Sequence, residues 1–132
     1  IDNLLAYYSV GLKPSSSSDP YSLRRQTIGL LKILIEGNYN INLHELLVRC
    51  STFVPKFQPA LIEEILKFTT ARAKGVFEEF GLKKDEIDAS LRSFCINPYD
   101  QFCQVQALHE FRKTAAFPRL FEVYKRAKGQ LY

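Results

Sequence analysis

The sequence of 132 residues contains no methionine and no tryptophan, and only three cysteines and two histidines. Cys50, Cys95 and Cys103 form no C-x-x-C pair and are odd in number, which disfavours a disulfide framework or a zinc site and favours a reducing compartment. We expect all three to be small buried hydrophobic side chains. His44 and His109 have no ligand residue at metal-binding spacing, and we expect His109 to be a satisfied histidine at the core or its rim.

Motifs for catalysis and for cofactor binding are also absent. The six glycines are scattered singly and form no Walker-type loop, nucleophile elbow or dinucleotide fingerprint. We therefore predict no catalytic residue, cofactor or metal within the chain itself. No apolar run approaches the roughly 20 residues that span a bilayer, so no membrane partner is expected. The start at Ile1, without a methionine anywhere, indicates a fragment of a longer protein, whose chemistry would then lie elsewhere.

Strand patterns are missing, because Val, Ile and Thr never alternate with polar residues over five or more positions. Helical spacing of apolar residues is abundant, as in Ile62, Ile65, Thr69, Ala73 and the positions that follow them, Val76 and Phe80. The fold is predicted to be all-α, a bundle of about six to seven short antiparallel helices. We expect helices at about 2–10, 20–36, 43–50, 59–80, 85–94, 98–113 and from 117 onwards.

The stretch "GLKPSSSSDPYSLRRQ", residues 11–26, admits three interpretations: a linker, a phosphate-binding loop or a capped helix start. Asp19 is a favoured N-cap, and Pro20 suits the first helical position, so local chemistry explains a helix start without a ligand. The Asp19 charge at the helix end disfavours a bound phosphate there. The four serines are too few to separate two domains widely.

The next helix contains Arg25, Gly29 and Lys32 at i, i+4 and i+7, on one face. A helical glycine costs about 1 kcal/mol relative to alanine, so a reason for Gly29 is expected. Close packing of a neighbouring helix is one explanation, which we favour, and contact with a nucleic acid is the other. On the long helix that follows, Lys74 and Glu78 have the i,i+4 spacing of a surface ion pair.

The charge is mildly positive overall and concentrated at one end. The net charge is +4, from 18 Lys and Arg against 14 Asp and Glu. The last 30 residues contain six bases and two acids, which equals the net charge of the whole chain. This distribution suits an anionic partner, although a solvated helix surface would look the same. A DNA-binding helix-turn-helix is disfavoured, because no short turn leads into a helix with Arg, Asn or Gln clustered at its start.

Several stretches of the sequence resemble a known family. "GLKPSSSSDPYSLRRQTIGLLKILIE" is similar to a segment of the β subunit of bacterial heterotetrameric glycyl-tRNA synthetases, which reads GLKPTGSKDPFALRR before an Ala-x-Gly-hydrophobic helix. Residues 68–80 are similar to that family's long helix with an internal arginine, and "DEIDASLR", "VQALHEF" and "YKRAKGQL" are similar to its later motifs. Ser16, Ser18, Tyr124 and Gly129 depart from the pattern, where the family has Gly, Lys, Asn and Asn.

The resemblance implies that residues 1–54 end an HD-like helical domain and that residues 55–132 form a DALR-like anticodon-binding domain. The two prolines of residues 51–59 make that segment the best boundary candidate. The parent enzyme would be a cytoplasmic glycine–tRNA ligase that uses ATP with Mg²⁺, and its adenylation site would lie in an α subunit or an α-like region. The implied partners are tRNA(Gly) and that α subunit.

We accordingly predict tRNA binding through basic side chains on phosphates, with stacking of unpaired bases on aromatic rings. Tyr124 is one possible stacking residue, although its spacing from Leu120 is more typical of the core or its rim. A purely structural module that docks other parts of the synthetase is the alternative. The candidate tRNA-binding residues are, in order, Lys125, Arg126, Lys128, Arg72, Lys74, Arg24 and Arg25.

Overall fold

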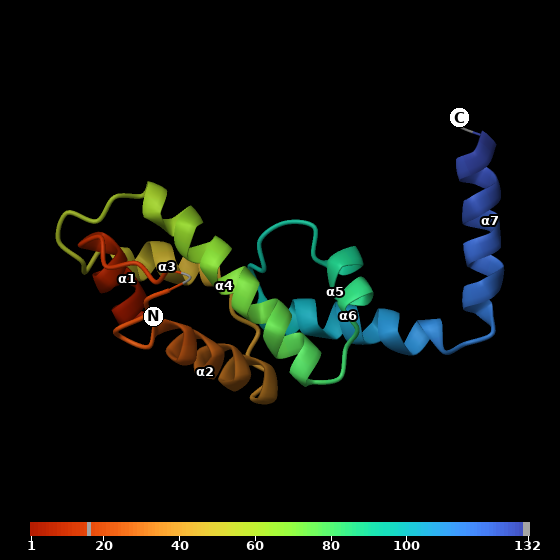
Figure 1. Cartoon of the computed structure of the whole chain (residues 1–132), viewed down its shortest axis with the longest axis horizontal. Helices are drawn as coiled ribbons and strands as arrows, with labels where there is room; N and C mark the ends of the chain where they lie inside the picture. Colours follow the sequence, from red (N-terminus) through yellow and green to blue (C-terminus); the bar gives the residue numbers. More distant parts are fainter. Residues whose placement is uncertain (16, 131–132) are drawn as a thin grey trace.

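The structure, a computed structural model, describes residues 1–15 and 17–130, and this part of the chain forms seven α-helices and no strand (Figure 1). The all-α prediction is therefore confirmed. None of these helices combines the length and the apolar character needed to cross a membrane. The helices are α1 (Asp2–Ser9), α2 (Leu23–Glu36), α3 (Leu43–Ser51), α4 (Ala60–Glu79), α5 (Lys84–Ser90), α6 (Pro98–Arg112) and α7 (Ala116–Gln130).

Helix α4 lies at the centre of the molecule, and α1, α2, α3 and α5 all pack against it. Its predicted apolar stripe is confirmed at every position from Ile62 to Val76, all of which are buried. Thr69 fits this stripe because its hydroxyl donates to the carbonyl of Ile65, at 2.8 Å. Phe80, the last residue of the predicted stripe, lies at the exposed end of the helix instead.

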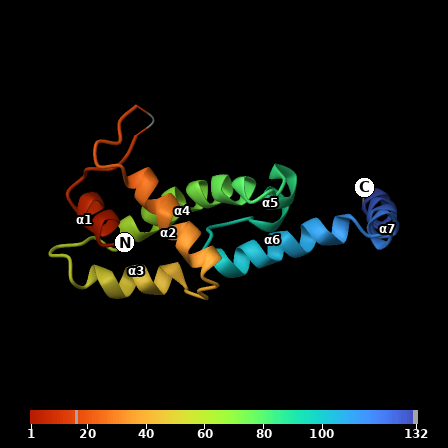
Figure 2. The same cartoon turned by 90° about the horizontal axis from the view of Figure 1, so that it is seen from below.

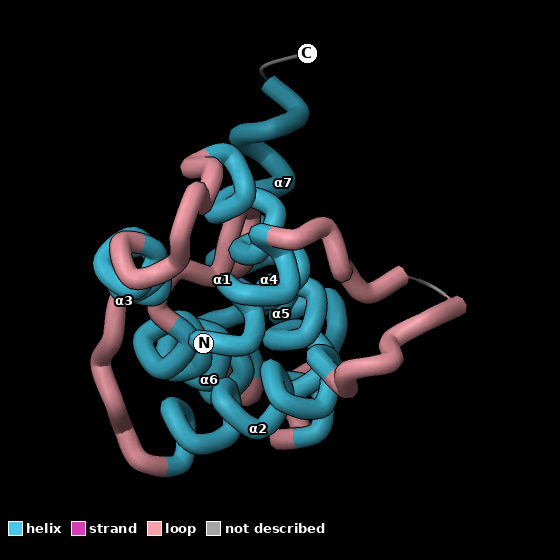
Figure 3. Tube along the Cα trace, turned by 90° about the vertical axis from the view of Figure 1, so that its left-hand side faces the viewer, coloured by secondary structure: helices cyan, strands magenta, loops and turns pink. Residues whose placement is uncertain are grey.

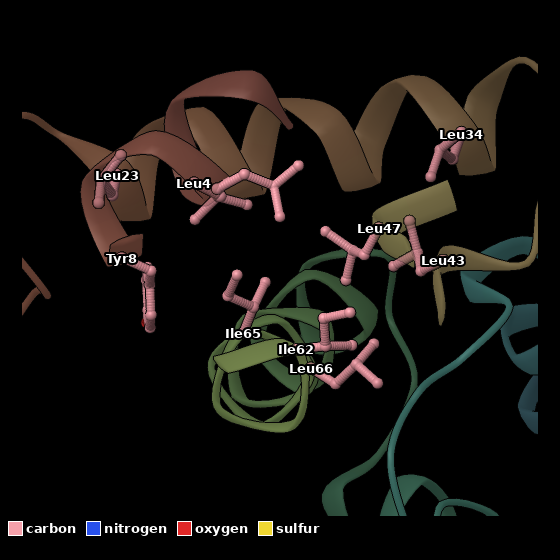
Figure 4. Packing of buried hydrophobic residues seen from close by; sticks show 10 residues of the cluster. Leu4, Tyr8, Leu23, Leu34, Leu43, Leu47, Ile62, Ile65 and Leu66 are labelled. Carbon is pink, nitrogen blue, oxygen red and sulfur yellow. The ribbon is translucent and has the colours of Figure 1, made fainter. Parts of the chain in front are cut away.

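The buried side chains form two clusters that share α2 and α4. In the first, Leu4 of α1 and Leu47 of α3 lie against the first half of α4, around Ile65 (Figure 4). The second contains the later residues of α2 and α4, such as Leu31 and Phe77, together with side chains from α5 and α6. Since α2 and α4 contribute to both clusters, they join the two ends of the core. The domain boundary near residue 54 stays a prediction.

Helix α2 begins at Leu23, three residues later than predicted. The Asp19 carboxylate does cap it, accepting from the amides of Leu23 at 2.9 Å and of Arg24 at 3.0 Å. Pro20, however, lies in a turn before the helix, and Ser22 adopts a left-handed conformation with φ 54°. Stacking of the Tyr21 ring on Tyr7, with centroids 4.3 Å apart, holds this turn outside the helix. The loop that precedes α2 stands out from the helices in Figure 3.

Helix α5 ends at Ser90, four residues before the predicted end at Phe94. Leu91 leaves the helical conformation, and the segment after it is tied to other helices. The amide of Cys95 donates to the Thr70 hydroxyl of α4 at 2.8 Å, and the carbonyl of Ile96 accepts from the amide of Leu43 at 2.7 Å. These long-range bonds hold residues 91–97 in an irregular path between α3 and α4.

The packing explanation for Gly29 is wrong. A Cβ atom added at Gly29 would meet nothing within 4 Å, so no neighbouring helix approaches the backbone at this position. Of the cysteines, only Cys95 is buried as predicted, and burial raises the pKa of its thiol to about 12. Cys50 and Cys103 are half-buried, and all three thiols are free.

Helix α7 projects from the far end of α6, away from the two core clusters (Figures 1 and 2). It contains no buried residue, and it packs against α6. Its larger apolar side chains are not covered: Leu120, Phe121 and Tyr124 are 44–56% exposed, although the spacing of Tyr124 from Leu120 is typical of the core or its rim. Phe117 at the start of the helix is half-buried and meets Phe111 of α6 edge-on, with ring centroids 6.0 Å apart. α7 is thus held mainly at its first turn.

Candidate nucleic-acid interface

The first three predicted residues, Lys125, Arg126 and Lys128, are all exposed on α7. None of them forms an ion pair with another residue of the described chain. An unpaired cation in solvent keeps its full attraction for a phosphate. These three residues therefore have the electrostatic properties that the prediction requires.

The three cations do not point to a single side of α7. The Lys125 ammonium lies over the ring of Phe121, 4.5 Å from its centroid, and the Lys128 ammonium lies 5.9 Å from the centroid of Tyr124. Arg126 instead shares a side with Arg119, seven residues earlier, because two helical turns separate them. Arg119 is also exposed and unpaired in the described chain, and our sequence reasoning missed it. The i,i+7 spacing was the signal that could have found it.

A groove of about 440 Å³ separates α7 from α5 and α6. Its α7 wall is aromatic, formed by Phe117, Phe121 and Tyr124, and its opposite wall includes Ala89 and Leu108. The rings of Phe117 and Phe121 are nearly parallel, with an interplanar angle of 13° and centroids 5.9 Å apart. Flat rings beside exposed cations form the kind of surface on which unstacked bases bind.

Beneath this groove lies a buried carboxylate, Glu86, whose side chain is only 2% exposed. It contacts Nδ1 of His109 at 2.8 Å and accepts from Arg112 at 3.0 Å and from the amide of Lys83 at 3.2 Å. Burial alone would raise the pKa of Glu86, but these donors outweigh it and lower the pKa below the ordinary value. The network fixes α5 against the end of α6 from which α7 departs, and it confirms His109 as a satisfied rim histidine.

The two candidates on α4 differ from each other. Lys74 pairs with Asp88 of α5 at 3.4 Å, and the predicted i,i+4 pair with Glu78 is absent from the described ion pairs. Arg72 is half-buried, and its guanidinium carbon lies 5.3 Å from the centroid of Phe68. Its Nε is buried and has no hydrogen-bond partner in the described chain. Lys74 is thus partly neutralised, whereas Arg72 is not.

Arg24 and Arg25 also have different surroundings. Arg24 donates to the carbonyl of Ser15 and lies 3.8 Å from the Asp19 carboxylate, so it holds its own loop against the start of α2. Lys13, in the same loop, pairs with Glu64 of α4. Arg25 is exposed and makes no ion pair among the described residues. The Leu-Arg-Arg motif therefore contains one arginine that holds a loop and one that faces solvent.

The seven predicted residues do not form one continuous patch. α7 stands at the opposite end of the molecule from α2 and from the first half of α4 in both Figure 1 and Figure 2. The structure separates an α7 group from an α2–α4 group, and α5 and α6 lie between them. Sequence spacing cannot reveal this separation, because it depends on the direction in which α7 leaves α6.

Comparison with known proteins identifies relatives over nearly the whole chain. A profile of the family described as "Glycyl-tRNA synthetase beta subunit" matches residues 1–92. The chain is 35% identical to the glycine–tRNA ligase β subunit of Bacillus subtilis over 96% of its length, and 35% identical to that of Pseudomonas syringae pv. tomato over 99%. It is 29% identical to the β subunit of Natranaerobius thermophilus over 98% of its length.

The chain spans about a fifth of the length of these curated relatives, 19–20% in each case. The profile match ends at Arg92, before α6 and α7, whereas the alignments with these relatives cover 96–99% of the chain. From the profile match over residues 1–92 and the similarity over nearly the whole chain, we conclude that the chain belongs to the glycyl-tRNA synthetase β-subunit family.

Proposed function

We propose that this chain is a tRNA-binding part of a glycine–tRNA ligase, and that it grips tRNA(Gly) through α7. Membership of the family supports the first half of this proposal, and the relatives carry the name glycine–tRNA ligase β subunit. The observation that carries the second half is the set of four exposed cations on α7, none of them paired within the described chain. They lie beside the aromatic wall of the groove.

The parent enzyme, in this proposal, joins glycine to its tRNA in the cytoplasm with ATP and Mg²⁺. Its adenylation chemistry belongs to an α subunit or an α-like region. The β subunit associates with that part of the enzyme. The chain itself contributes binding energy and position. We expect the isolated chain to catalyse no ATP–pyrophosphate exchange, and detectable exchange would overturn this division of labour.

The proposed contacts follow from the chemistry of α7. Lysine and arginine side chains attract phosphates and release the counterions around them, so binding weakens as salt rises. An unpaired base can stack on an aromatic ring, with roughly 1–3 kcal/mol for each stacked base. Phe121 and Tyr124 offer such rings next to Lys125 and Lys128. The anticodon bases are the natural candidates, because single-stranded loops are read in this way.

The test is tRNA(Gly) binding by the chain at several salt concentrations, measured by fluorescence anisotropy. Replacement of Lys125, Arg126 and Lys128 by Glu is expected to abolish measurable binding at moderate salt. The logarithm of the affinity falls linearly with the logarithm of the salt concentration. Neutral Gln at the same three positions is expected to reduce the magnitude of this slope by about two to three.

The matched control replaces Arg49, Lys56 and Lys67 by Glu, three exposed cations that form no ion pair among the described residues. This control changes the net charge by the same amount but leaves α7 intact. We expect it to weaken binding only slightly. Equal losses in the two triple variants would show that net charge, and not α7, carries the interaction.

A docking role is the second candidate, and the exposed apolar side chains beyond α3 favour it. Phe53 is 86% exposed and lines a groove of about 420 Å³ with Val54 and Pro55. A contiguous apolar patch in solvent, as opposed to a single side chain, is typical of an interface with another part of a protein. Phe53→Ser is expected to weaken association with the α subunit in the full β subunit and to leave tRNA binding by this chain unchanged.

A further inference from the structure

Helices α6 and α7 are joined by a short linker, residues 113–115, whose sequence contains neither glycine nor proline. Pro118, in the first turn of α7, accounts for the break between the two helices. A helix that continued through the linker would need an N–H donor at position 118 for the carbonyl of Thr114, and the proline ring would collide with that carbonyl. The proline therefore separates α6 from α7, but it does not set the direction in which α7 leaves the junction.

The contacts that hold α7 lie at its first turn. Phe117 lies outside both core clusters of the described residues, and its ring meets Phe111 of α6 edge-on. The guanidinium carbon of Arg112 lies 5.8 Å from the centroid of the same ring, within reach of a cation–π attraction. Further along, Leu120 and Tyr124 are each 56% exposed, and α7 projects away from the other helices (Figures 1 and 2).

Arg112 is also tied to α5. Its Nη1 donates to Oε1 of Glu86 and to Oδ2 of Asp85, each at 3.0 Å. Glu86 is a firm anchor, because its side chain is buried and also contacts His109 at 2.8 Å. A single guanidinium thus joins the carboxylates of α5 to the first turn of α7.

The same arginine lines the groove of about 440 Å³ that separates α7 from α5 and α6. Phe121 and Tyr124 line one side of this groove, and Ala89 and Leu108 line the other. Because both walls are apolar, burial of their surfaces would draw α7 toward α5 and α6 if nothing held it away. The groove therefore stays open only while α7 keeps its direction.

We propose that Arg112 is a positioning residue, which sets the direction of α7 by joining the carboxylates of α5 to the ring of Phe117. It keeps the groove open and holds the four cations of α7 in one orientation. A ligand that contacts several points binds more tightly when those points are already in place. The effect on tRNA rests on the function proposed for α7, whereas the direction of α7 does not depend on that function.

The direct test is the distance between two spin labels, measured by pulsed electron paramagnetic resonance on the 132-residue chain. The labels are attached to Gln106→Cys of α6 and Ala127→Cys of α7, two exposed positions, after Cys50 and Cys103 have been replaced by Ser. Cys95 is buried and is kept. Ala127 lies about 16 Å along α7 from its first residue, so a rotation of the helix by about 30° moves the label by about 8 Å.

Arg112→Gln is expected to broaden the distribution of distances and to shift it by several ångströms toward shorter values. Phe117→Leu removes the other end of the contact and leaves both core clusters intact, so it is expected to have the same effect in a chain that folds like the parent. Lys113→Gln is the matched control, because it removes a neighbouring charge whose partner is Glu110 of α6. Distributions that match the parent in both Arg112→Gln and Phe117→Leu would overturn the proposal, and so would an equal shift in Lys113→Gln.

The salt dependence of tRNA(Gly) binding separates positioning from direct contact. Neutralising a residue that contacts a phosphate lowers the slope of log affinity against log salt by about one. Arg112→Gln is expected to weaken binding by about three- to tenfold with this slope unchanged, because all four cations of α7 remain. Its combination with Phe117→Leu is expected to weaken binding no further than Arg112→Gln alone. A slope reduced by about one would make Arg112 a phosphate contact and overturn its positioning role.

The two proposals for α7 fail in different measurements. A parent chain that binds no tRNA(Gly) would contradict the function proposed for α7, and the spin-label distances would still decide whether Arg112 sets the direction of the helix. A parent chain that binds tRNA(Gly), with distances that do not change in Arg112→Gln or Phe117→Leu, would overturn the positioning role alone.

Discussion

Helices α4 and α7 both have apolar side chains at helical spacing, yet one forms the centre of the protein and the other lies outside it. Ile65, Ala73 and Phe77 of α4 are completely buried, because α1, α2, α3 and α5 pack around that helix. The corresponding stripe of α7, with Leu120 and Tyr124, remains in contact with solvent. Amphipathic spacing therefore indicates that a helix has an apolar face. Whether that face is buried depends on how the other helices pack.

The same contrast applies to the charged residues of the two regions. Around the core, several cations pair with a carboxylate, as in Arg24 with Asp19 and Lys74 with Asp88. On α7 a single acid, Glu122, accompanies four bases. Several cations of the core region thus act on the protein itself, whereas the four bases of α7 form no ion pair within the described chain.

The comparison between α4 and α7 is tested most strongly by the free energy of unfolding of two Phe→Ala variants, one in each helix. Phe77→Ala removes a completely buried ring from the second cluster and is expected to cost about 3–5 kcal/mol. Phe121→Ala removes the same ring from α7, where it is 44% exposed, and is expected to cost less than about 0.5 kcal/mol. Urea unfolding followed by circular dichroism measures both. Similar losses in the two variants would show that α7 is packed as tightly as α4.

The buried Glu86 network is expected to have the next largest effect. Glu86→Gln leaves His109 and Arg112 without their anionic partner and is expected to cost about 2 kcal/mol at neutral pH. Asp88→Asn, which removes only an exposed pair, is expected to cost less than about 0.5 kcal/mol. Unfolding in urea at pH 7 compares the two. A cost that is equal at both positions would contradict the distinction between buried and exposed pairs.

The Glu86 network also predicts an acid dependence with a definite sign. Its pKa is lower in the folded state than the ordinary value of 4.5, so its full contribution to stability is present above that pH. As pH falls further, the unfolded chain takes up a proton first, and the contribution is lost by the time pH passes the folded-state pKa. The parent chain is therefore expected to lose stability below about pH 4.5 more steeply than Glu86→Gln. Thermal unfolding between pH 3 and 7 measures the two slopes.

A smaller effect, of opposite sign, is expected on α2. Gly29→Ala adds a Cβ where nothing lies within 4 Å, and it removes the helical penalty of glycine. Stability is expected to rise by about 0.5–1 kcal/mol. The measurement is the midpoint of thermal unfolding. A decrease would restore the close-packing explanation that the structure rejects.

Removal of the whole of α7 is also expected to have only a small effect on stability. A chain that ends at Ala115 loses no buried residue of either cluster, so its free energy of unfolding is expected to change by no more than about 1 kcal/mol. Its affinity for tRNA(Gly) is expected to fall below detection. Urea unfolding and anisotropy titrations on one preparation give both values. A truncated chain that fails to fold would show that α7 is needed for the stability of the core.

The chemistry and spacing of the residues determined much of this protein. The absence of strand patterns and the helical spacing of the apolar residues, as in the stripe of α4, were sufficient to predict an all-α fold with nearly all helix bounds within three residues. These features are local, since each depends on residues a few positions apart. The Leu-Arg-Arg stretch and the motifs after it were sufficient for the family, which the comparisons confirm.

Tertiary structure decided which side chains remain available for binding. Asp88 reaches Lys74 across α5 and α4, the ring of Phe68 lies against Arg72, and the turn after Arg112 directs α7 away from the core. Each of these outcomes depends on how helices lie relative to one another, which no local spacing encodes. The positive charges of α7 and of Arg72 can be read in the sequence, but only packing shows that they have no partner within the described chain.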